Sequence, residues 1–276
     1  MKNKILKIFL SILTLSSIYI NISNVSAFSG DIPEIMQPKT IIEYISNDEF
    51  EIINGGFLSP DKLQEEKNKL KENQIVSQKF LKEKFPDQII DETNVITEEI
   101  TPVKGMKITY GDNCLIFDVE YPNGVENPLL KENNKQLRGD FLPDGVSLLR
   151  QWGTTPNKLY IDRKNDTIIG IGTATTFNDY IGQANHVLEK GDIATKLSFD
   201  NCQLGLDVYV TAKKSNGSSY TKVMKKWDAG GMPNAIVDIW KDGVQFWDYT
   251  YYEQLSLNGS TTIEHDNLNV NGGKLY

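Results

Sequence analysis

The sequence is poor in the residues on which metal and nucleophilic chemistry most often depend. Its 276 residues include two histidines, His186 and His265, and two cysteines, Cys114 and Cys202. It has no Gly-x-Ser-x-Gly elbow, no His-Glu-x-x-His pair, no paired-cysteine metal motif and no phosphate-binding glycine loop. We therefore expect no metal and no cofactor, and the chemistry that remains is that of carboxylates, hydroxyls and aromatic rings.

Long apolar runs are absent after the first residues of the chain. Three lysines and an apolar stretch over residues 8–20 precede a small-residue cleavage site that ends at Ala27. This order predicts a secretory signal peptide over residues 1–27 and an exported mature chain from Phe28. Because the signal carries three lysines and no acid, the net charge falls from −8 to −11 when it is removed. Such an acidic, secreted protein is a poor candidate for binding nucleic acid or, after cleavage, a membrane.

Two regions of different character follow the signal peptide. Ser59 and Pro60 predict the start of a helix, which Pro86 ends. After residue 157 the chain becomes a series of short strand-like runs separated by turn residues. We expect a mainly β protein with some helix, made of an α+β region over residues 28–157 and a β domain over residues 158–276.

The two cysteines leave two alternatives. Export permits a disulfide between Cys114 and Cys202, which would tie the middle of the chain to its C-terminal third. The other possibility is two separate thiols. Sequence alone does not choose between them.

The segment "KKWDAGGMPNAIVDIW" places Asp228 and Asp238 on either side of a glycine-containing turn. The simpler interpretation of Asp228 is a turn residue that binds nearby backbone amides. The functional one is an acid beside Trp227 in a partly apolar cleft, where desolvation and a second carboxylate raise the pKa. A carboxylic acid that stays protonated can donate its proton to a glycosidic oxygen.

Three motifs follow one another in the C-terminal region. They are "GIGTATTF" at residues 170–177, "DIATKLSFDNCQLGLDVYV" at residues 192–210 and "WDAGGMPNAIVDIW" at residues 227–240. Their order resembles the double-psi β-barrel superfamily, which includes expansin-like, rare lipoprotein A-like and barwin-like proteins and a bacterial family named for three aspartates. The resemblance begins near residue 165 and implies a six-stranded double-psi β-barrel at the C-terminus.

The resemblance also implies roles for particular residues. Asp228 corresponds to the catalytic acid of the lytic members, and Thr175 lines the same sugar-binding groove. Asp238 corresponds to a groove or helix-capping residue, and the three-aspartate family adds Asp200. Trp227 offers a stacking surface for a sugar ring. The histidine that lytic members often place before the central strand has no evident counterpart here.

These features predict a secreted, cell-wall-associated protein whose barrel binds a polysaccharide, with peptidoglycan as the leading candidate, and loosens or cleaves it. The alternative is a non-catalytic inhibitor of a secreted protease, which would present the loop at residues 201–205. A third is a host-directed factor encoded by the N-terminal half. That half could also be a wall-binding module, a pro-segment or a cover over the groove.

Overall fold

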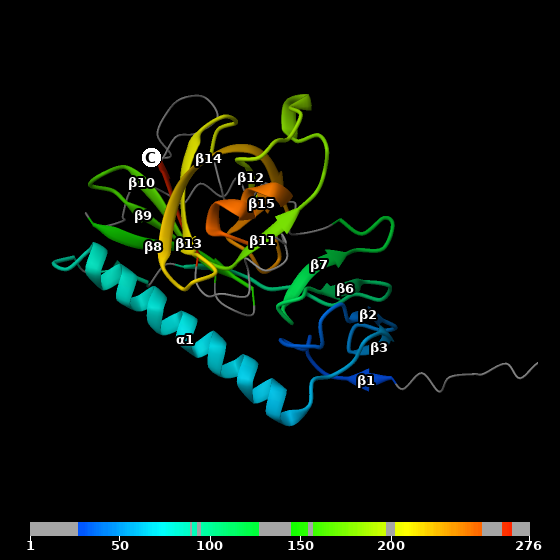
Figure 1. Cartoon of the computed structure of the whole chain (residues 1–276). Helices are drawn as coiled ribbons and strands as arrows, with labels where there is room; N and C mark the ends of the chain where they lie inside the picture. The colour runs from blue at the N-terminus through cyan, green and yellow to red at the C-terminus, as the bar shows by residue number, and fades with distance from the viewer. Residues whose placement is uncertain are drawn as a thin grey trace, which may run out of the picture.

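The structure is a computed structural model that describes residues 27–88, 90–92, 95–126, 145–153, 157–196, 202–249 and 261–266. These residues form two β-sheets, one long α-helix and two short 3-10 helices (Figure 1). The expectation of a mainly β protein with some helix is confirmed. The predicted signal peptide, except for Ala27, lies outside the described residues, and so does Asp200.

The smaller sheet contains five antiparallel strands from the N-terminal part of the chain. Side chains alternate between core and surface along these strands, so that Ile42 and Tyr44 are both buried. They form one core with Phe50, Ile108 and Tyr110. In hydrogen-bonded order the strands are β1 (Phe28–Ser29), β3 (Glu49–Asn54), β2 (Ile41–Tyr44), β6 (Lys107–Tyr110) and β7 (Ile116–Glu120).

The larger sheet contains eleven strands and surrounds the main hydrophobic core. Ile193, Val208 and Val237 contribute to this core from the strands, and Trp247 contributes from the 3-10 helix η4 (Lys241–Trp247). In order the strands are β11 (Ala174–Phe177), β15 (Val237–Trp240), β12 (Asp192–Lys196), β14 (Ser219–Gly230), β13 (Asp207–Lys213), β16 (Thr261–Asp266), β10 (Thr167–Gly172), β9 (Asn157–Asp162), β8 (Val146–Trp152) and β4 (Ile90–Asp91), with β5 (Ile96–Glu98) also paired to β8.

The long helix, α1 (Pro60–Lys84), begins where the sequence predicts. Ser59 is its N-cap and accepts a hydrogen bond from the Lys62 N–H at 3.4 Å, which satisfies one of the free donors of the first turn. Among the described residues there is no helix with the length and apolar character that a membrane crossing requires.

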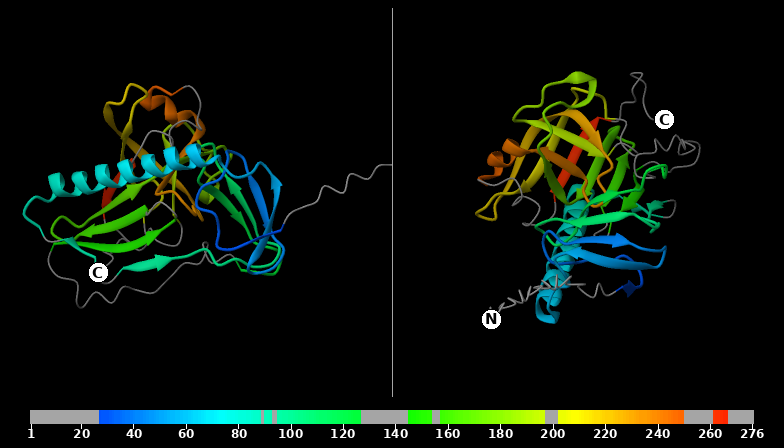
Figure 2. Two further views of the ribbon diagram at one scale, coloured as in Figure 1. Left: turned by 90° about the horizontal axis from the view of Figure 1, so that it is seen from below. Right: turned by 90° about the vertical axis from the view of Figure 1, so that its right-hand side faces the viewer.

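The same helix packs on both sheets. Near its start Leu63 and Leu70 pack against a small cluster that includes Leu115, beside the smaller sheet. At its end Leu81 and Phe85 pack against side chains of β8, β9 and β10. Figure 2 shows α1 running from the smaller sheet to these strands of the larger one. The helix therefore joins the two sheets through its two ends.

Strand pairing crosses the predicted boundary between residues 157 and 158. β8 and β9 are antiparallel neighbours, with Val146 opposite Asp162 and Trp152 opposite Asn157. β4 and β5, also from the expected N-terminal region, pair with β8 in the same sheet. Backbone hydrogen bonds therefore cross the predicted boundary, and the larger sheet extends back to residue 90.

The closed six-stranded barrel expected at the C-terminus is not confirmed. The strand order of the larger sheet is a path with two ends, β11 and β4. β10 and β11 nevertheless follow one another with only Thr173 between them, although β10 pairs with β16 and β9 whereas β11 pairs with β15. The pairs β11–β15 and β12–β14 are parallel, so this part of the sheet mixes both directions.

Cys114 and Cys202 are not joined by a disulfide. Cys114 is buried with Ile35 and Leu115, whereas Cys202 is buried in the core of the larger sheet. Burial raises the pKa of the Cys114 thiol to about 11, which leaves it protonated and unreactive. Of the two alternatives, the structure has two thiols at separate sites.

Candidate functional site

The structure brings three of the expected site residues into one row across four neighbouring strands. Thr175 of β11 lies opposite Asp238 of β15, Asp238 lies opposite Ala194 of β12, and Ala194 lies opposite Asp228 of β14. Residues that oppose one another in neighbouring strands place their side chains on the same face of a sheet. The turn between the two aspartates therefore returns the chain so that both carboxylates lie on one face, with only the methyl group of Ala194 between them.

Asp238 is the more strongly perturbed of the two acids. Its Oδ1 atom is buried and has no hydrogen-bond partner among the described residues. Burial raises the pKa of Asp238 to about 7, and the negative charges of Asp179 and Asp228 act in the same direction. A hydrogen bond from the Thr175 hydroxyl opposes the shift. Asp238 therefore holds a proton close to neutral pH.

Asp228 combines the two interpretations that the sequence left open. Its carboxylate accepts hydrogen bonds from the backbone N–H groups of Ala229 and Gln183, as a turn residue would. Burial nevertheless raises the pKa of Asp228, and the nearby charge of Asp179 raises it further, while the two hydrogen bonds and Lys226 lower it. It is thus an acid held in a fixed position.

Trp227 lies beside the row and is positioned by a β-bulge. In the pairing of β12 with β14, Ile193 lies opposite Lys226 and Ala194 lies opposite Asp228, so Trp227 is the extra residue. Its ring stacks on His186, with the ring centroids 4.2 Å apart and the planes 13° from parallel. Part of this expected sugar-stacking surface is therefore covered by a protein side chain.

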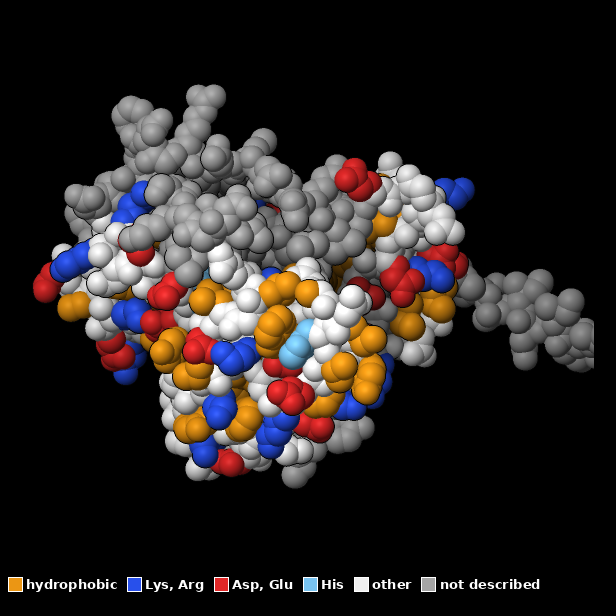
Figure 3. Space-filling model, turned by 90° about the horizontal axis from the view of Figure 1, so that it is seen from above, with side chains coloured by type: hydrophobic (Ala, Val, Ile, Leu, Met, Phe, Trp, Pro, Cys, Tyr) orange, Lys and Arg blue, Asp and Glu red, His pale blue; other side chains and the backbone are white. Residues whose placement is uncertain are grey.

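Sequence reasoning gave His186 no role. The structure places its Nε2 atom 2.9 Å from Oδ2 of the buried Asp192. The segment turns sharply because Ala184 and Asn185 both have positive φ, at 53° and 58°, and neither is the glycine that usually marks such a turn. On the face seen in Figure 3, hydrophobic side chains gather around a histidine. The exposed apolar residues of this segment are Tyr180, Ile181 and Val187.

A cavity of about 320 Å³ lies at the row and is bounded by both sheets. Thr175 and Asp238 line it from the larger sheet, whereas Phe117 and Asp118 of β7 line it from the smaller sheet. Asp228 is not among its lining residues, so the acid row reaches the cavity through Asp238. The other lining residues are Ile116, Val119, Gly230 at the end of β14, and the loop of residues 231–235.

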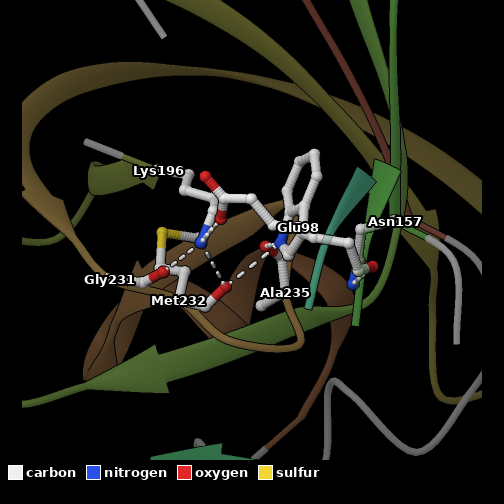
Figure 4. Close-up of polar contacts among 7 residues, drawn as sticks. Glu98, Asn157, Lys196, Gly231, Met232 and Ala235 are labelled. Atoms are coloured by element: carbon white, nitrogen blue, oxygen red, sulfur yellow. Dashed lines mark hydrogen bonds and ion pairs between the residues drawn. The ribbon is translucent and has the colours of Figure 1, made fainter. Parts of the chain in front are cut away.

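That loop is held from behind by Lys196 of β12 (Figure 4). Lys196 is only 2% exposed, and its ammonium group donates hydrogen bonds to the carbonyl oxygens of Gly231 and, at 3.4 Å, Met232. The indole N–H of Trp152 donates to the carbonyl oxygens of Met232 and Ala235 at 3.1 and 3.2 Å. Three loop carbonyls are thereby fixed by two buried side chains.

Glu98 of β5 supplies the counter-charge for Lys196. Its Oε2 atom lies 3.4 Å from the Lys196 ammonium nitrogen, which also lies 5.5 Å from the centre of the Trp152 ring. Burial lowers the pKa of Lys196 to about 8, and the Glu98 carboxylate opposes this shift. Because the charge is both paired and hydrogen-bonded, we interpret this cluster as structural support for the cavity wall.

Comparisons of the chain with protein-family models, curated proteins and solved structures found no match. In the part of the chain that the structure describes, no three His, Cys, Asp or Glu residues come together in a way that could hold a metal ion.

Proposed function

We propose that this chain is an exported protein that binds a cell-wall polysaccharide, peptidoglycan, and cleaves its glycosidic bonds with the Asp228–Asp238 pair as the acid. The observation that carries the proposal is the row of Thr175, Asp238, Ala194 and Asp228 at the edge of a cavity of about 320 Å³. Concave sites with a few convergent polar groups are the usual places for ligand binding.

The acid pair can supply one proton near neutral pH. Burial and the nearby charges of Asp179 and Asp228 raise the pKa of Asp238 to about 7, so Asp238 is the member of the pair that holds a proton near neutral pH. In the proposed reaction the protonated acid donates to the glycosidic oxygen while the bond to the anomeric carbon breaks. A hydroxyl group of the same sugar attacks that carbon and returns its proton to the carboxylate. This route needs no separate nucleophile and forms an anhydro-sugar.

The proposal includes a double-psi arrangement of the strands from β10 to β16. Two observations support it. The first is that β10 and β11 lie almost end to end through Thr173, so that one continuous segment pairs with β16 at its start and β15 at its end. The second is the presence of the parallel pairs β11–β15 and β12–β14 within a mainly antiparallel sheet.

We assign the smaller sheet to the polysaccharide site as its second wall. Phe117 and Asp118 of β7 line the same cavity as Thr175 and Asp238. This arrangement favours a wall or cover of the groove over a module that binds at a distance.

The test is retention of the mature chain, residues 28–276, on purified peptidoglycan and on cellulose, followed by mass spectrometry of released fragments. Wild type is compared with Asp228→Asn and Asp238→Asn. Asp207→Asn is the control, because Asp207 is exposed and paired with Lys225 at 2.7 Å, away from the row. We expect anhydro-sugar fragments from wild type and the control, and none from the two row variants.

Retention of all four proteins without fragments would reduce the proposal to a non-cleaving, expansin-like binder. If the wild type is retained on neither polymer, the proposal is contradicted and the alternative of protease inhibition is favoured. Of the four residues of the loop expected for inhibition that the structure describes, 202–205, Cys202 is buried and Leu204 is exposed.

A further inference from the structure

Phe117 is an exposed aromatic side chain that a β-bulge presents at the junction of the two sheets. Thr109 lies opposite Asp118 and Tyr110 lies opposite Ile116, so Phe117 has no partner residue in β6. Bulges redirect side chains and occur often beside functional sites. Phe117 is 44% exposed, although neighbouring Ile116 and Val119 are buried. The bulge therefore leaves the Phe117 ring at the surface while Ile116 and Val119 lie in the core.

The backbone beneath this ring is close. A Cβ atom at Gly111 would lie 3.4 Å from the Cβ atom of Phe117 and 3.7 Å from its Cδ2 atom. These are ordinary van der Waals distances, so Phe117 lies directly beside Gly111 at the turn between β6 and β7.

Phe117 and Thr175 are shared by two cavities of about 320 Å³ each. One is the acid cavity described above. The other extends from Thr175 and Thr176 toward the smaller sheet, where it reaches Asn54 and Asn113. A ligand long enough to leave the acid cavity past Thr175 would meet the ring of Phe117 and then enter this second cavity.

The lining of the second cavity suits an uncharged, hydroxyl-rich ligand. Its two charged side chains, Lys39 and Asp112, are 3.6 Å apart and neutralise one another. Asn54 uses its amide nitrogen to bind the Lys39 carbonyl, and Asn113 uses its amide oxygen to accept from the Leu115 N–H. Within the described ranges, the other amide atom of each has no protein partner. One acceptor and one donor therefore remain beside an aromatic face, which is the combination a sugar ring needs.

We propose that Phe117, Asn54 and Asn113 form a second sugar subsite, which binds an uncharged sugar unit of the same polysaccharide that occupies the acid row. This inference rests on the proposed function for its ligand, but it depends on the smaller sheet and not on the acids. It makes the N-terminal region part of the binding groove.

The experiment compares Phe117→Ala with Phe57→Ala in the mature chain. Phe57 is a matched control, because it is 45% exposed, belongs to the same N-terminal region and lines neither cavity. Retention on purified peptidoglycan is measured for both. In parallel, a short uncharged oligomer of N-acetylglucosamine is titrated into each protein while the backbone amide signals of Gly111 and Asn113 are followed by NMR.

We expect Phe117→Ala to weaken retention and oligomer affinity about tenfold and Phe57→Ala to leave both unchanged, as removal of one aromatic contact predicts. If Phe117→Ala is retained as strongly as wild type and the same amide signals shift, the second subsite is wrong while the proposed function stands. If wild type shows these shifts but neither binds nor cleaves the polymer, the proposed function fails and the subsite stands. If wild type responds to neither probe, both fail.

Discussion

On either side of the loop at residues 231–235 the protein buries charged groups in opposite ways. Lys196, behind the loop, has a counter-charge in Glu98 and two carbonyl acceptors. Asp238, in front of it, has an unpartnered buried oxygen and two other carboxylates nearby. Pairing with Glu98 partly offsets the cost of burying the Lys196 charge, whereas a charge left beside like charges has no such compensation and raises the energy of the folded state. The difference separates the supporting part of the site from the part that can do chemistry.

The largest expected change in stability comes from removing the Lys196 ammonium group, which supports the loop at residues 231–235. Lys196→Met removes the ammonium group and leaves Glu98 and the loop carbonyls without their partner. We expect the free energy of unfolding to fall by about 3 kcal/mol, in the range for loss of one member of a buried pair. Urea unfolding measures this.

A double variant sharpens the interpretation. Glu98→Gln combined with Lys196→Met should lose less stability than the sum of the two single changes, because the pair is coupled. Additive losses would show that Lys196 and Glu98 act independently and would contradict the pairing.

The next largest expected effect is a gain in stability when Asp238 is replaced. Asp238→Asn removes a carboxylate that is buried beside two others, so we expect the variant to be about 1–2 kcal/mol more stable than wild type at pH 8 and to release no fragments. Thermal unfolding at pH 8 gives the comparison, with Asp207→Asn as the control. A destabilised Asp238→Asn protein would mean that the carboxylate is structural.

Asp238 and Lys196 should also make the free energy of unfolding change with pH in opposite directions, each in its own pH range. The pKa of Asp238 is raised from 3.8 to about 7, so its stabilising contribution is complete below pH 3.8 and is lost as the pH rises through 7. The pKa of Lys196 is lowered from 10.5 to about 8, so its contribution is complete above pH 10.5 and is lost as the pH falls through 8. The free energy of unfolding is measured against pH for wild type, Asp238→Asn and Lys196→Met. The difference between wild type and each variant isolates the slope that the replaced residue contributes. Slopes of the same sign would contradict the comparison.

The smallest effect tests the hydrogen bond between Thr175 and Asp238. Thr175→Val removes the hydroxyl that lowers the pKa of Asp238, so this pKa should rise further, by up to about one unit. The carboxyl carbon signal of Asp238, followed by NMR against pH, reports the midpoint. Thr176→Val is the control, because Thr176 lies opposite Ile239 and not Asp238. Equal midpoints in all three proteins would exclude the hydrogen bond as a cause.

Part of the site could be predicted from the sequence because the resemblance supplied an ordered set of motifs. These motifs contain Asp228, Asp238 and Thr175, and the strand register places the three residues in one row. Phe117, Asp118, Asp179 and Glu98 could not be predicted in the same way, because they come from segments without a motif. His186 lies in a turn whose positive-φ residues are Ala184 and Asn185, so no glycine marks the turn in the sequence.

The sequence by itself determined the local features: where α1 begins, why Ser59 caps it, and that short strands dominate the chain after residue 157. These depend on capping and on side-chain periodicity over a few residues. Only the tertiary structure decided that the larger sheet extends back to residue 90, that Glu98 neutralises Lys196, and that β7 faces Thr175. Such contacts join residues far apart in the chain, and they depend on how whole strands compete for partners and register, which no local pattern encodes.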